Sequence, residues 1–203
     1  MTVIVNPLKV APTVLVAAVG EAEGARGAAA ALACAVADSD AAPLMIDVGG
    51  RAPRPTLVTS AAAQQLEGRL ETHLPDAKVA ARGQVCHLAV PADAEALAVA
   101  SRAVATARET GVVVHVPSEL LQEALAEPTL PASAVLLRAN LGGDRALVAL
   151  AVRDLVERGL SAAVLKHRLS WVAERRALFG LLPLGSSGGL PDRIVRRLTQ
   201  VAR

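Results

Sequence analysis

The sequence predicts a single α/β domain with a doubly wound, mostly parallel sheet and helices on both of its faces. Short apolar runs alternate along the chain with longer segments of helical periodicity, and Gly, Pro and Asp residues separate them. This order is typical of βαβ crossovers, in which a helix returns the chain to the next buried parallel strand. With 203 residues, of which 53% are hydrophobic, the chain can also form one sizeable aliphatic core.

Each predicted strand is an aliphatic or β-branched run that ends at Gly, Pro or a polar residue. These runs predict strands at residues 13–19, 43–48, 85–90, 112–116, 133–138 and 162–166. The segments between and after them predict helices at residues 28–37, 60–70, 92–110, 119–126, 145–158 and 191–203. Ser60, Ser118 and Asp144 stand where a side chain can cap a helix N-terminus. Gly111 and Gly159 follow two of the predicted helix ends.

Three segments are expected along the chain: a short extension at residues 1–12, the α/β domain at 13–184, and a tail at 185–203. The tail begins with the linker GSSGG and continues as a basic amphipathic helix, whose apolar stripe consists of Ile194, Val195, Leu198 and Val201. Two interpretations of this helix are open. The stripe packs on the sheet, or the helix is an arm that binds a protein partner or an anionic membrane.

Composition excludes several classes of function. A net charge of +2 gives no reason to expect nucleic acid as a partner. Cys34 and Cys86 lie in separate apolar runs, which favours buried free thiols in a reducing compartment. The four histidines show no metal-ligand spacing, so no metal site is expected. No run resembles a signal peptide or a membrane span, and we therefore expect a cytoplasmic protein.

The loop between the first predicted strand and the first predicted helix has a distinctive composition. Residues 20–28 read GEAEGARGA, which resembles in place and length the GKGGxGKST phosphate loop of the MinD/ParA group of P-loop ATPases. In a gapless match, Gly20 takes the position of the first glycine and Gly24 that of the variable residue. Glu21 stands at the signature lysine of the group, and Glu23 at one of its glycines.

The remaining positions of this loop carry the chemistry of the family. Arg26 lies where the phosphate-gripping lysine belongs, and Gly27 replaces one residue of the Ser/Thr pair that ligates Mg²⁺. A phosphate loop works by pointing backbone N–H groups, a helix N-terminus and an ammonium group at the phosphates. Glu21 and Glu23 would repel phosphate, and Gly27 has no hydroxyl for magnesium. The resemblance therefore implies that ATP and ADP bind weakly or not at all and that no cofactor is held.

The carboxylates of this loop also suggest a specific local conformation. We expect the loop to wrap between strand and helix, with Glu21 or Glu23 near the free N–H groups at the start of the helix. The helix dipole favours a carboxylate in that place by roughly 0.3–1 kcal/mol.

Two further positions fit the same family. Asp47 ends the second predicted strand (LMIDVGG), as an aspartate does in the LLIDAD-like segment of the group. The segment VVVHVPS resembles the hhhDxP Walker B motif, with His115 in place of the magnesium-organising aspartate. The residues alone leave a second interpretation open, in which Asp47 caps a turn and His115 is a hydrogen-bonded core histidine.

The resemblance extends over residues 13–184 and implies a non-catalytic protein, a MinD/ParA-like pseudo-ATPase. Such a protein, as in the TadZ/CpaE-like pilus-assembly branch, would localise or assemble a bacterial membrane-associated machine such as a pilus or secretion system. Protein partners, a homodimer and contact with the inner face of the membrane would follow.

Two alternatives are enzymes. A dinucleotide-binding, Rossmann-like oxidoreductase would use Gly20, Gly24 and Gly27 with Asp47, although the spacing is not GxGxxG and the chain has no Tyr for short-chain dehydrogenase chemistry. A divergent nucleotide hydrolase would use Arg26 and Asp47.

Overall fold

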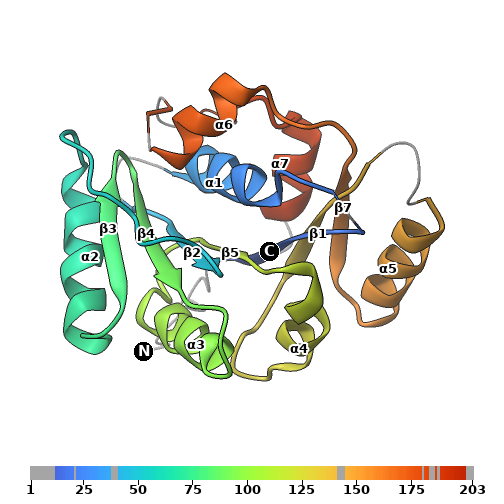
Figure 1. Ribbon diagram of the computed structural model, residues 1–203, viewed down its shortest axis with the longest axis horizontal. Coiled ribbons are helices and arrows are strands. Elements are labelled where there is room, and N and C mark those ends of the chain that lie inside the picture. Colours follow the sequence, from blue (N-terminus) through green and yellow to red (C-terminus); the bar gives the residue numbers. More distant parts are fainter. Residues whose placement is uncertain are drawn as a thin grey trace, which may run out of the picture.

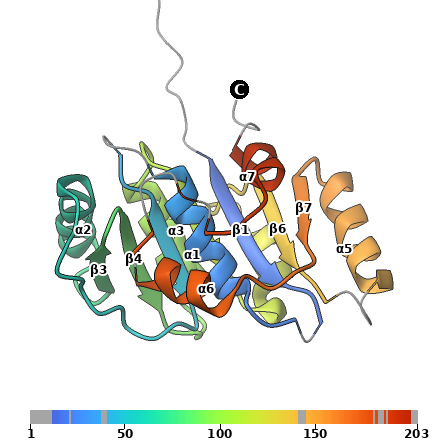
Figure 2. The same ribbon diagram turned by 90° about the horizontal axis from the view of Figure 1, so that it is seen from above.

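The computed structural model describes residues 12–20, 22–37, 41–140, 145–179, 181–182, 186 and 188–199. Within these residues, seven strands form one mostly parallel sheet with helices on both faces (Figures 1 and 2). The predicted fold class is thereby confirmed, and the architecture is consistent with the doubly wound fold of P-loop NTPases.

The sheet has the strand order β3-β4-β2-β5-β1-β6-β7, and β3 runs antiparallel to β4 at one edge. The bounds are β1 Thr13–Ala18, β2 Leu44–Val48, β3 Lys78–Arg82, β4 Val85–Val90, β5 Val112–His115, β6 Ala134–Arg138 and β7 Ser161–Leu165. The six predicted strands correspond to β1, β2 and β4 to β7. The edge strand β3 was not predicted, because its first two residues are exposed or half-buried and break the apolar run.

Helices cover the sheet in two layers. Their bounds are α1 Ala25–Val36, α2 Ala61–His73, α3 Ala96–Thr106, η1 Ser118–Leu120 (a 3-10 turn), α4 Leu121–Ala126, α5 Arg145–Glu157, α6 Trp171–Leu178 and α7 Asp192–Thr199. Helices α1, α6 and α7 lie on one face, α3 and α4 lie on the other, and α2 and α5 flank the two edges (Figure 1). One apolar core fills each side of the sheet.

Several predicted helix bounds are confirmed. Ser60 caps α2, where its hydroxyl oxygen accepts a hydrogen bond from the Ala63 N–H at 3.1 Å. Gly159 follows α5 with φ of +75°, the left-handed conformation that a glycine adopts readily after a helix. Asp144, the predicted cap of α5, lies outside the described residues.

Other predicted bounds differ from the structure. Helix α1 begins three residues early, at Ala25, directly after Gly24, which has φ of +88°. Helix α3 ends at Thr106 and is followed by turns, so Gly111 does not terminate it. Ser118 begins a 3-10 turn and donates its hydroxyl hydrogen to Glu119 instead of capping a helix.

Helix α7 belongs to the core. Ile194 and Leu198 are buried in the apolar layer that contains α1, and α7 contacts β7. Arg193, Arg196 and Arg197 are exposed. For the described residues the stripe thus packs on the sheet, as the first interpretation of this helix expects; Val201 lies outside them. None of the helices in the described part of the chain combines the length and apolarity needed to cross a bilayer.

Candidate functional site

The topology points to the carboxyl ends of β1 and β5. The chain leaves β1 for β2 on one side of the sheet, and it leaves β5 for β6 on the other. The carboxyl ends of these adjacent strands therefore form a topological switch point, where doubly wound folds bind their ligands. The loop after β1, the first turn of α1, and the ends of β2 and β5 meet there.

Three of the predicted site residues form one cluster at this point. Asp47 is opposite His115 in the β2–β5 register, and its Oδ1 lies 2.9 Å from His115 Nδ1. Its Oδ2 lies 2.5 Å from Arg26 Nε. Among the residues that the structure describes, that N–H has no partner in hydrogen-bonding geometry, so the Arg26–Asp47 contact is an ion pair without a directed hydrogen bond. The Asp47 side chain is 7% exposed, and both of its oxygens are engaged.

Gly50 makes this arrangement possible. A Cβ at position 50 would overlap the Asp47 carboxylate, so the turn after β2 can close over Asp47 only with a glycine there. Asp47 is thus more than the cap of a turn, since it joins β2, β5 and α1 through its two partners. His115 is likewise half-buried beside a carboxylate and is not enclosed in the apolar core.

The cluster has one evident chemical capacity. A carboxylate accepts a hydrogen bond from Nδ1–H and thereby fixes the tautomer and orientation of the imidazole, which leaves Nε2 as a potential proton acceptor. Such a pair acts as a general base only when a substrate hydroxyl or water lies within hydrogen-bond reach of Nε2. Arg26 offsets the Asp47 charge at the same time, so the cluster is also a self-contained structural ion pair.

The loop from Gly20 to Gly27 does follow β1 into α1, with φ of +61° at Gly20 and +88° at Gly24. The carboxylate of Glu23 is 79% exposed and pairs with Arg168 Nη1 at 3.2 Å. The expectation that Glu21 or Glu23 lies near the free N–H groups at the start of the helix stays a prediction. Glu21 lies outside the described residues.

A different carboxylate packs against the first turn of α1. The side chain of Glu174, from α6, lies so close to Gly27 that a Cβ at position 27 would overlap its Cγ, Cδ and Oε1. Glu174 Oε2 lies 3.6 Å from Arg168 Nε, and the side chain is only 15% exposed. A carboxylate beside a helix N-terminus is favoured by the helix dipole. Gly27, which the resemblance aligns with a residue of the Ser/Thr pair, is in the structure the contact point for α6.

Sequence reasoning missed Glu174 because it did not predict α6. A signal was present: Ser170 precedes the segment WVAERRAL, and its hydroxyl accepts a hydrogen bond from the Ala173 N–H at 3.2 Å. A serine before eight residues without Gly or Pro is a recognisable helix start.

Arg138 adds a buried cation behind the loop. It ends β6, is 4% exposed, and donates from Nη1 to the Ala139 carbonyl oxygen. Among the described residues its Nε has no partner, and this atom lies 4.0 Å from the place of a Cβ on Gly24. Burial lowers the pKa of Arg138, the charge of Arg168 lowers it further, and Glu174 opposes the shift. Gly24 of the loop is therefore flanked by the side chains of Arg138 and Arg168.

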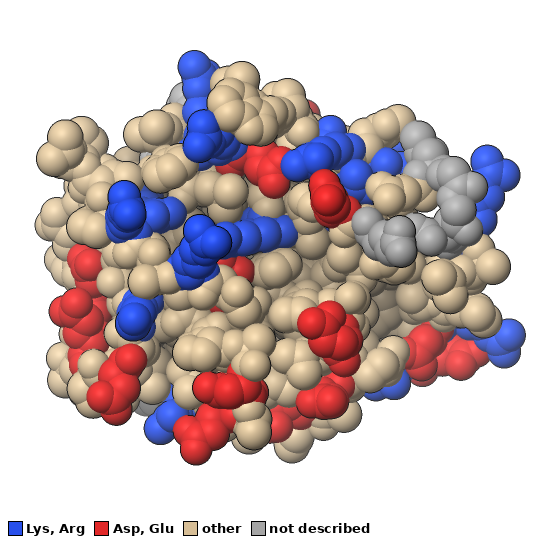
Figure 3. Space-filling model, in the orientation of Figure 1, with Lys and Arg blue, Asp and Glu red and all other residues tan. Residues whose placement is uncertain are grey.

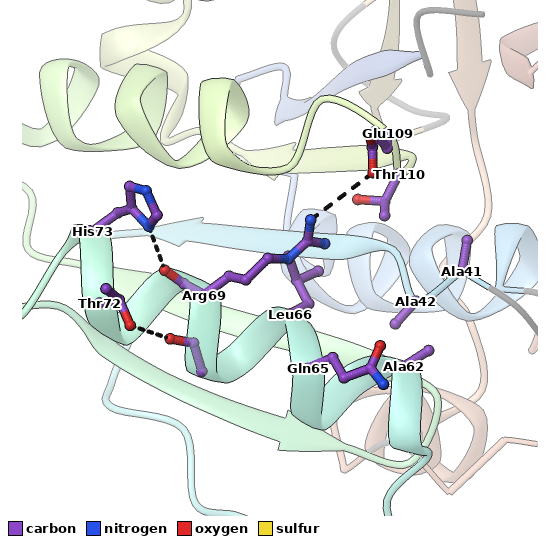
Figure 4. A pocket seen from close by; sticks show the side chains of 11 residues that line it. Ala41, Ala42, Ala62, Gln65, Leu66, Arg69, Thr72, His73, Glu109 and Thr110 are labelled. Atoms are coloured by element: carbon purple, nitrogen blue, oxygen red, sulfur yellow. Dashed lines mark hydrogen bonds and ion pairs between the residues drawn. The ribbon is translucent and has the colours of Figure 1, made fainter.

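The most prominent hollow lies away from this cluster. It measures about 850 Å³ and is formed by α2, the residues before β2 and those before β5, at the amino ends of the strands. Figure 4 shows Arg69 of α2 reaching across it to Glu109, with 4.0 Å between Nη1 and Oε2. None of the described residues of the predicted site lines this hollow.

In the described part of the chain, no three His, Cys, Asp or Glu side chains converge as a metal ion would require. No model of a known protein family matches the sequence. No curated protein is significantly similar to it.

Proposed function

We propose that this chain is a non-catalytic, MinD/ParA-like protein, a pseudo-ATPase that acts as a localisation or assembly factor for a bacterial membrane-associated machine such as a pilus or secretion system. In this proposal it works through protein partners, including a second copy of itself, on the cytoplasmic side of the membrane. It neither requires a nucleotide nor hydrolyses one.

One observation carries the proposal: the protein's own side chains occupy the groups that a phosphate would use. Glu174 lies against the first turn of α1, and Arg26 is paired with Asp47. A phosphate at the loop would have to displace the first carboxylate and compete with the second for Arg26. Removing Arg26 from Asp47 would leave a buried carboxylate without its cation, which costs several kcal/mol in such sites.

The same contacts weigh against a dinucleotide-binding enzyme. In a Rossmann-type site the acidic residue after the second strand accepts hydrogen bonds from the ribose hydroxyls. Both oxygens of Asp47 are already bound, to Arg26 and to His115. A divergent nucleotide hydrolase remains the second candidate, favoured by the hydrogen bond between His115 and Asp47.

Equilibrium binding of labelled ATP, ADP and NAD to the purified protein, with and without magnesium, tests these functions. We expect dissociation constants no tighter than about millimolar, equivalent to ~4 kcal/mol, and hydrolysis indistinguishable from buffer. Arg26→Ala should not change either result. The matched control is Arg108→Ala, which removes an exposed arginine beyond α3.

Micromolar affinity for Mg-ATP that Arg26→Ala abolishes and Arg108→Ala preserves would refute the pseudo-ATPase and support the hydrolase. Micromolar NAD affinity lost in Asp47→Asn would instead support the dinucleotide-binding enzyme.

A further inference from the structure

Helix α6 presents an unusual face to solvent. Trp171, Val172, Arg175, Arg176 and Phe179, the last directly after the helix, recur at helical spacing on one side. Trp171 is 64%, Val172 51% and Phe179 42% exposed, and both arginines are exposed as well. The chain has one Trp and one Phe, and both lie on this outward face. Within the described structure neither ring is buried in the core, so the core does not gain the free energy that burial of these two rings would contribute.

The inward face of the same helix explains its attachment. Ala177 is fully buried against α1, and Glu174 contacts Gly27. α6 is therefore held to the body by Ala177, Leu178 and Glu174, while Trp171 and the two arginines are exposed. Figures 1 and 2 show α6 outermost on the α1 side of the sheet.

The apolar surface continues beyond the helix. Arg82 donates from Nε to the Arg54 carbonyl oxygen at 2.7 Å and from Nη1 to the Leu178 carbonyl oxygen, and so joins the end of α6 to the loop after β2. Its guanidinium also lies 5.5 Å from the centre of the Phe179 ring. That loop bears two strongly exposed aliphatic side chains, Leu57 and Val58, and Leu181 is exposed beyond Phe179.

Charge on this side of the molecule is unevenly distributed. Figure 3 shows most Lys and Arg in the upper part of the view, over α1 and α6, with some acidic residues among them, whereas most Asp and Glu lie along the lower and lateral margins. The Arg175 guanidinium lies 4.7 Å from the centre of the Trp171 ring, a cation–π geometry. The acidic residue of α6, Glu174, faces inward, so the outward face of the helix is purely basic and apolar.

We propose that the outward face of α6 docks on an anionic lipid membrane. Trp is favoured at the boundary between headgroups and acyl chains, and arginines beside it are attracted to anionic headgroups. An extended acidic peptide would share the charge, but such peptides bind in a groove or at a sheet edge, and the outward face of α6 is a projecting helix. The cavities along α2, α3 and α5 include no residue of α6. This inference rests on the surface of α6 alone and holds whether or not the site binds a nucleotide.

The single tryptophan makes the test direct, because all indole fluorescence reports on Trp171. The full chain is titrated with vesicles of phosphatidylcholine and phosphatidylglycerol in equal parts, or of phosphatidylcholine alone. We expect a blue shift of the emission and co-sedimentation with the anionic vesicles only, both lost at high salt. Replacing both Arg175 and Arg176 by Ala should weaken partitioning roughly thirtyfold, since each juxtamembrane arginine contributes about a factor of five.

The matched control replaces Arg102 and Arg108, which removes the same charge from the α3 side of the sheet and should leave partitioning unchanged. Circular dichroism of each variant checks that it is folded. If both double variants lost partitioning onto anionic vesicles equally, binding would depend on net charge alone, and the proposal would be overturned. No shift with anionic vesicles would also overturn it, and a shift with polyglutamate in their place would indicate an acidic protein partner.

Discussion

His87 makes the stability of this protein sensitive to acid. It lies in the middle of β4, 5% exposed, and its Nε2 has no hydrogen-bond partner among the described residues. Burial lowers the pKa of His87 to about 3, and the nearby charges of Arg82 and Arg26 add to the shift. The folded protein therefore holds His87 neutral over a pH range in which the unfolded chain is protonated.

The sign and size of the effect follow from proton linkage. An unfolded histidine titrates near about pH 6.5, so between there and about pH 3 the unfolded state binds one more proton than the folded state. The contribution of His87 to the free energy of unfolding is complete above about pH 6.5. Below that pH, the free energy of unfolding decreases by ~1.4 kcal/mol for each unit by which the pH is lowered. Between about pH 7 and about pH 5, His87 alone should lower the free energy of unfolding by about 2 kcal/mol.

Urea denaturation at these two pH values, followed by far-ultraviolet circular dichroism, measures this contribution. In His87→Leu the pH-dependent loss should shrink by about 2 kcal/mol, while the carboxylates common to both proteins cancel in the comparison. His73→Gln, at an exposed histidine on α2, should leave the loss unchanged. Identical pH dependence in the wild type and His87→Leu would refute the reasoning, because it would mean that the folded protein accommodates the charged imidazole.

Two further substitutions, each compared with a control substitution, test the packing of α7 and of the Asp47 cluster. Leu198→Ala should lower the free energy of unfolding by roughly 2–5 kcal/mol because Leu198 is fully buried, whereas the exposed Arg197→Ala should change it by less than about 0.5 kcal/mol; similar values for both would remove α7 from the core. Gly50→Ala should destabilise by roughly 1–3 kcal/mol because its methyl group displaces Asp47 from two partners. Gly68→Ala, in open space within α2, should instead stabilise by roughly 0.5–1 kcal/mol, and a neutral result at position 50 would show that the Asp47 cluster yields easily.

The strands of this fold were predictable because most of them are buried on both faces. Every residue of β2 and β4 is buried, which requires the continuous apolar runs from which they were identified. Strand β3 lies at the edge, where Lys78 is exposed, so its sequence carries no such run. Helix α6 also escaped prediction, because Trp171 and Val172 are exposed while the carboxylate of Glu174 faces inward, so its apolar residues form no single stripe.

The candidate site was predictable only in part, and for a related reason. Asp47 and His115 end neighbouring parallel strands, so their positions in the sequence alone place them at one edge of the sheet. Glu174 reaches Gly27 across a chain separation of well over a hundred residues, and Arg138 is brought behind the loop by the β1–β6 pairing. Contacts of that range depend on how helices cross the sheet, which no local pattern in a single sequence records.

The close approach of Glu174 to Gly27 also limits how this chain could change over time. A threonine at position 27 would meet the Glu174 side chain before it could meet any metal ion. Replacing Glu174 first would leave Arg168 with Glu23 as its one remaining carboxylate partner among the described residues and would add no new ligand. A hydroxyl side chain at position 27 would therefore require the Glu174 side chain to move away from the first turn of α1 or to be replaced.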